Sequence, residues 1–128
     1  MTAFDKWLRG LAAAGKGPAT LYCTRGVAFR SGLALQADLT GATIRGEVRA
    51  SPDATGAPLA VFGVTALSVA AGITTTTLSL TEAEVGALPP DPTGDGVFDL
   101  VFDLLITPSG GAEDRLFAGL FQITGKVT

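Results

Sequence analysis

The chain contains no histidine, and cysteine, tryptophan and tyrosine each occur only once in its 128 residues. The missing imidazole removes the usual general base and the commonest metal ligand at neutral pH. The single cysteine, Cys23, excludes an internal disulfide and a zinc site built on several cysteines. It lies in an apolar, strand-like segment, so we expect a core role for its thiol. We therefore predict a protein that is not an enzyme, with no catalytic residue, metal or cofactor.

Charged residues are also scarce, at 16%, whereas hydrophobic residues reach 47%. The net charge of −3 gives no basic footprint for nucleic acid. No segment has the length of a transmembrane helix, and residues 1–14 lack the apolar centre of a signal peptide. We predict a protein made in the cytoplasm that binds no nucleic acid and inserts into no membrane. Its high apolar content favours a surface that a partner covers.

Short strand-like segments make up most of the chain. In residues 43–49 polar residues alternate strictly with apolar residues or glycine. This period of two is typical of a strand with one solvent-exposed face and one buried face. The expected strands are residues 21–23, 27–36, 43–50, 59–62, 64–70, 73–80, 97–107 and 116–124. Turns that recur every 8–12 residues or so are typical of an antiparallel sandwich. We predict an all-β fold, an antiparallel immunoglobulin-like β-sandwich of about seven or eight strands.

One short helix is expected inside the sandwich. Thr81 and Glu84 have the spacing of a capping box, in which the side chain of each residue accepts a hydrogen bond from the backbone N–H of the other. Pro89 and Pro90 end this helix after one or two turns.

A second short helix is expected at the N-terminus, over residues 3–14, with Thr2 as its cap. Its apolar stripe consists of Phe4, Trp7, Leu8 and Leu11. We divide the chain into an N-terminal helix and tether, residues 1–18, and a β-sandwich domain, residues 19–128.

Two features point to contact with another chain. The N-terminal stripe either folds back on its own sandwich or docks on a neighbour, and its aromatic content and glycine–proline tether favour the neighbour. The last strand carries apolar side chains on both faces, which fits a central strand and a subunit contact equally well. From this strand we take Phe117, Phe121 and Ile123 as interface residues, in addition to the four residues of the stripe.

Five segments resemble, in their order and spacing, a domain of tailed-phage proteins. They are LYCTRG (21–26), LTGATIRGEVR (39–49), LSLTEAE (78–84), VFDL (97–100) and RLFAG (115–119). Across residues 20–128 the chain is similar to the small β-sandwich domain of phage baseplate and tail-fibre proteins, of the kind at the N-terminus of the baseplate upper protein.

The resemblance implies a non-enzymatic structural component of a phage or phage-like tail. It would be an adaptor that connects baseplate and tail fibre through oligomeric interfaces. Its partners would be other tail, baseplate or fibre proteins and copies of itself, with a trimer favoured. It would reside in the virion tail after synthesis in the host cytoplasm. The alternative is a carbohydrate- or cell-surface-binding β-sandwich module, although the β-domain holds one tyrosine and no tryptophan for stacking on sugars.

Overall fold

Nine strands and one short helix form the part of the protein that the computed structural model describes, residue 13 and residues 19–52, 54–89 and 96–125. The strands are β1 (Ala19–Thr24), β2 (Phe29–Leu35), β3 (Thr43–Arg49), β4 (Ala60–Val61), β5 (Gly63–Val64), β6 (Ser68–Ala70), β7 (Ile73–Leu80), β8 (Val97–Thr107) and β9 (Asp114–Thr124), and the helix is α2 (Glu82–Gly86). The predicted all-β class is confirmed. The helix predicted over residues 3–14 lies outside the described residues, except for Ala13.

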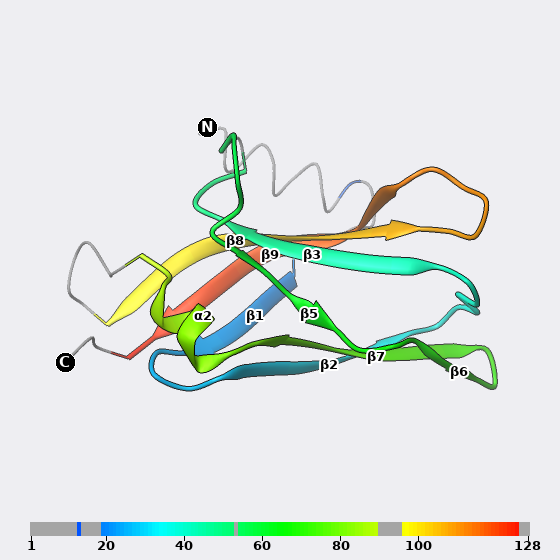
Figure 1. The fold of residues 1–128 in the computed structure, drawn as a ribbon, viewed down its shortest axis with the longest axis horizontal. Coiled ribbons are helices and arrows are strands. Elements are labelled where there is room, and N and C mark those ends of the chain that lie inside the picture. The colour runs from blue at the N-terminus through cyan, green and yellow to red at the C-terminus, as the bar shows by residue number, and fades with distance from the viewer. Residues whose placement is uncertain (1–12, 14–18, 53, 90–95, 126–128) are drawn as a thin grey trace.

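The strands form two sheets that lie one over the other (Figure 1). One sheet has the order β1–β9–β8–β3–β4, and the other has the order β2–β7–β5, with β6 also paired to β7. Every pair is antiparallel except β1 and β9, which are parallel. The purely antiparallel prediction is therefore wrong for this one pair. A parallel pair needs a long connection, and here nearly the whole domain separates the two strands.

The alternation predicted for residues 43–49 is confirmed in β3. Ile44, Gly46 and Val48 are buried, and the residues between them are exposed or half-buried. The inward positions meet β8, where Gly46 lies opposite Leu104. The period of two therefore identified both the strand and the face that it buries.

A β-bulge interrupts the alternation in β9. The register with β8 shifts between Leu104 and Leu105, which leaves one extra residue on β9. As a result both Leu116 and Phe117 pack against the buried core. Strict alternation would place these two adjacent side chains on opposite faces of the strand.

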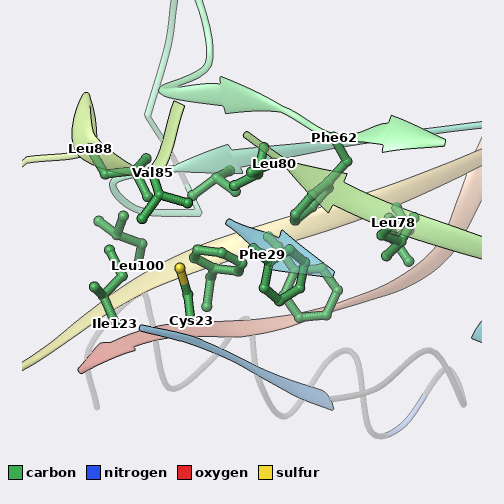
Figure 2. Packing of buried hydrophobic residues seen from close by; sticks show 13 residues of the cluster. Cys23, Phe29, Phe62, Leu78, Leu80, Val85, Leu88, Leu100 and Ile123 are labelled. Carbon is green, nitrogen blue, oxygen red and sulfur yellow. The ribbon is translucent and has the colours of Figure 1, made fainter. Parts of the chain in front are cut away.

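The helix α2 begins with the predicted capping box. The backbone N–H of Glu84 donates to Thr81 Oγ1 at 3.1 Å, and the backbone N–H of Thr81 donates to Glu84 Oε1 at 2.9 Å. The helix directs Val85 into the core, where it is fully buried together with Leu88 (Figure 2). The helix thus closes one end of the space between the sheets.

Three phenylalanine rings meet in the core between the sheets. Phe29 comes from β2, Phe121 from β9, and Phe62 from the residue between β4 and β5. Their ring centroids are 5.1–5.7 Å apart in tilted and edge-on arrangements. Figure 2 shows Phe29 and Phe62 directed into the space between the layers. Both sheets are thereby joined through one aromatic cluster.

We expect Gly119→Ala to destabilise the protein, because Gly119 allows β1 to lie close against β9. A Cβ at this position would fall 2.6 Å from the backbone nitrogen of Ala19, and its carbonyl oxygen lies closer still. Backbone atoms cannot yield as a flexible side chain does, so we expect the free energy of unfolding to fall by about 1–3 kcal/mol or more. Urea denaturation followed by circular dichroism measures this change.

Gly86→Ala is the matched control for this substitution. A Cβ at Gly86, in α2, would have no atom within 4 Å. Alanine is also the better helix former, so we expect no loss of stability or a gain of up to about 1 kcal/mol. Equal destabilisation by the two variants would contradict the close approach of β1 to β9.

Candidate functional site

Of the seven interface residues predicted from the sequence, the structure describes three. The other four lie outside the described residues: Phe4, Trp7, Leu8 and Leu11. Phe121 and Ile123 are 0% and 1% exposed, so the core of the domain itself covers both side chains. Phe117 is half-buried and lines a cleft at the surface. The candidate site is therefore built around Phe117, and we do not keep Phe121 and Ile123 as interface residues.

The cleft opens between the two sheets at the side where β1 and β2 are the terminal strands. It has a volume of about 230 Å³. Its walls come from both layers, namely Ala19 and Leu21 of β1, Ser31, Gly32 and Leu33 of β2, Leu78 of β7, Phe102 and Leu104 of β8, and Phe117 of β9. All but one of the lining side chains are apolar or absent, so the cleft presents carbon atoms almost exclusively.

A small inward residue in the middle of β2 keeps the cleft open. The ends of the strand, Phe29 and Leu35, are buried, whereas Ser31 and Leu33 on the same inward face are only half-buried. A serine side chain is too short to reach the opposite sheet, and Gly32 beside it lies at an exposed position of the strand. Glycine inside a strand often marks a place where a ligand or another backbone comes close.

The cleft has the chemistry of a binding surface. No lining residue is ionisable, and Ser31 alone has a polar side-chain atom. General acid–base catalysis needs a titratable group within hydrogen-bond reach of the substrate, and the lining provides none. What the cleft offers is removal of an apolar group from water.

The volume of the cleft suggests the size of its occupant. An apolar cavity of about 150 Å³ is large enough to hold benzene, so 230 Å³ accommodates one large side chain. Pockets for small molecules usually have about 300–1,000 Å³, which is more than this cleft provides. A single apolar side chain from another segment is therefore the best match.

The outer face of the five-stranded sheet carries ion pairs that link β8 to β9 and β3 to Glu113, the residue before β9. Arg115 donates to both carboxylate oxygens of Asp103 at 2.9 Å, and Arg45 donates to those of Glu113 at 2.7 and 2.9 Å. These hydrogen bonds raise the pKa of both arginines and lower the pKa of Glu113. Solvent and salt screen exposed pairs of this kind, so their contribution to stability is small. They tie the strands together on the side away from the cleft.

Two further classes of site have no counterpart in the described part of the chain. Within those residues no cluster of three or more His, Cys, Asp or Glu side chains could hold a metal ion. No helix among the same residues is long and apolar enough to cross a membrane.

Sequence reasoning did not identify the cleft, apart from Phe117. Leu21 and Leu33 read as ordinary inward residues of their strands, and they line a surface only because β1 and β2 end their sheets. The available signal was the pair Ser31-Gly32 inside a strand whose other inward residues are apolar. That signal is weak without knowledge of the strand order.

No known protein-family model matches this chain, and no curated protein matches it either. The function is therefore inferred from the cleft, from the sheet edges and from the resemblance of the five sequence segments to tail-protein domains.

We expect Cys23 to be unreactive while the protein is folded. The residue is 2% exposed, and burial raises the pKa of its thiol against a smaller opposing effect of Arg25. Because the thiolate is the reactive form, the folded protein should react with a disulfide reagent far more slowly than the protein in concentrated urea. A comparable rate in both states would contradict this placement of Cys23.

The same shift predicts a loss of stability at alkaline pH. The pKa of the thiol is raised in the folded state, so the unfolded chain loses this proton first. The contribution of Cys23 to stability is complete below the unfolded pKa of about 8.5 and declines as the pH rises above it. Urea denaturation at a series of pH values measures the decline. In the control variant Cys23→Ala this part of the pH dependence should disappear.

Proposed function

We propose that this protein is a non-enzymatic structural component of a phage or phage-like tail, an adaptor that connects baseplate and tail fibre. The observation that carries the proposal is the apolar cleft bordered by two terminal strands. Such a cleft suits the burial of a side chain from a neighbouring protein. The assembly itself is suggested by the resemblance of the five sequence segments to tail-protein domains.

The two strands beside the cleft also offer their backbones to a partner. Among the described residues, β1 pairs only with β9 and β2 pairs only with β7. A strand of a neighbouring chain can add to such an edge through main-chain hydrogen bonds, while its alternate side chains enter the adjacent pocket. We propose this mode of contact for the adaptor, both with other tail proteins and within a homo-oligomer, for which a trimer is favoured.

We also propose that the sandwich is immunoglobulin-like. Immunoglobulin domains place strands G, F, C and C′ in one sheet and strands B, E and D in the other. The order β9–β8–β3–β4 and the order β2–β7–β5 correspond to these two sets when the strands are taken in chain order. Because such folds host many functions, this correspondence supports the immunoglobulin-like architecture only. The proposed function depends on the cleft.

One observation favours a second function, carbohydrate or cell-surface binding. Tyr22 is 68% exposed on the outer face of β1. It pairs in register with Gln122, whose side-chain amide donates to Asp99 Oδ1 at 3.0 Å. An exposed ring beside an amide and a carboxylate can stack on a sugar and bond its hydroxyl groups. Loss of glycan-array binding in a Tyr22→Ala variant would support this second function.

Immunogold electron microscopy tests the location that the adaptor function requires. Tail particles purified from the source are labelled with an antibody against this chain. We expect label at the baseplate or at the base of the fibres. Particles without label, with the protein confined to the soluble fraction, would contradict the adaptor function.

A substitution in the cleft tests the docking surface separately. Ser31→Arg places a long charged side chain at the cleft, where its guanidinium can still reach water. We expect its incorporation into particles to fall about tenfold or more, because a filled pocket at an interface contributes roughly 2 kcal/mol or more.

Ser68→Arg is the control for this variant. It makes the same change at an exposed serine of β6, which does not line the cleft. It should be incorporated like the unmodified protein. Equal incorporation of both variants, with label still present on the tail, would contradict the cleft as the docking surface. It would not contradict the adaptor function.

A further inference from the structure

The five-stranded sheet has an outer face that points away from the second sheet. This face contains apolar residues whose side chains are buried. Ala118 is 0% exposed and Val101 is 4% exposed, yet neither belongs to the core between the sheets. Both point outward, because their neighbours Phe102 and Phe117 pack against that core. Leu120 lies opposite Val101 in the register and is half-buried. We name Val101, Ala118 and Leu120 the outer patch.

The burial of the outer patch is local. On the same face of β8, Asp99 is exposed and Val97 is 45% exposed, although they lie only two and four positions from Val101. Arg49 and Pro52 border Val101 from the side of β3. Ala118 lies farther from β3, opposite Asp103, whose ion pair with Arg115 adjoins it on one side, and on its other side it faces β1.

We propose that residues 4–11 of this chain cover the outer patch as a third layer. The stripe of Phe4, Trp7, Leu8 and Leu11 is the apolar surface that would face the patch. An amphipathic helix of this length is marginal in water, so it requires an apolar surface to pack on. The outer patch is such a surface, and it lies outside the core.

The connection along the chain places this segment beside the patch. Ala19 begins β1 and pairs with Gly119, the residue between Ala118 and Leu120. The helix expected over residues 3–14 includes Ala13, which is helical, and leaves four residues, 15–18, before β1. Four residues span up to roughly 14 Å when extended, which is enough to turn back over the neighbouring strand. The chain therefore leaves the stripe within reach of the patch without any rearrangement of the sheets.

The glycine–proline tether, which in the sequence favoured docking on a neighbour, is short, and its shortness instead favours the segment of the same chain over that of another copy. Short flexible linkers give effective concentrations in the millimolar range. A second copy in micromolar solution competes poorly against such a value. The N-terminal segment is then a layer of its own domain, and the cleft between β1 and β2 stays available for partners.

Nuclear magnetic resonance of the full chain tests the proposal directly. Trp7 is the only tryptophan, so its indole protons give a unique set of signals. We expect nuclear Overhauser contacts between the Trp7 ring and the methyl groups of Ala118 and Val101. A mixture of isotope-labelled and unlabelled chains separates contacts within a chain from contacts between chains. Contacts only between chains, or none to the outer patch, would overturn the proposal.

A charged substitution in the outer patch provides a second test. Ala118→Lys should displace the stripe, so the fluorescence of Trp7 should shift to longer wavelength and become easier to quench with acrylamide. Thr43→Lys, at an exposed outward position of β3, should leave both unchanged. If Ala118→Lys does not fold, Leu120→Lys replaces it at a half-buried position. Unchanged Trp7 emission in a folded patch variant would overturn the proposal.

Discussion

Contact among Phe29, Phe62 and Phe121 is the interaction on which the rest of the domain depends. Phe29 and Phe121 belong to different sheets, and Phe62 lies where the chain passes from β4 in one sheet to β5 in the other. The three rings therefore fix both the separation of the layers and the point of crossing. This arrangement requires a glycine in β3, because a Cβ at Gly46 would lie 2.7 Å from the ring of Phe62.

The position of this aromatic cluster also explains why the cleft lies at one side. Large rings hold the sheets apart, and every other position between the layers must be filled by side chains that span the same gap. Leucines and α2 fill it toward one end, with Val85 and Leu88. Ser31 is too short to fill it at the β1–β2 side. The cleft is thus the consequence of a small inward residue in a gap whose width larger residues set.

The local parts of this structure were predictable from the sequence, and the long-range parts were not. β3 and α2 could be identified because a period of two and a capping box each depend only on residues that are close together in the sequence. The bulge that turns Leu116 toward the core depends on register with β8, and the parallel placement of β1 depends on a strand near the other end of the domain. The cleft requires knowledge of which strands end each sheet, and no local pattern carries that information.

The pairing of β1 with β9 has a consequence for how the protein folds. Ala19 finds its partner Gly119 one hundred positions later in the chain. Synthesis at about 5–20 residues per second separates the two by roughly 5–20 seconds, and contacts between distant residues also form slowly. β1, which is synthesised before every other described strand, is therefore among the last of them to reach its native place. Until then its apolar side, with Leu21 and Cys23, is exposed to other nascent chains.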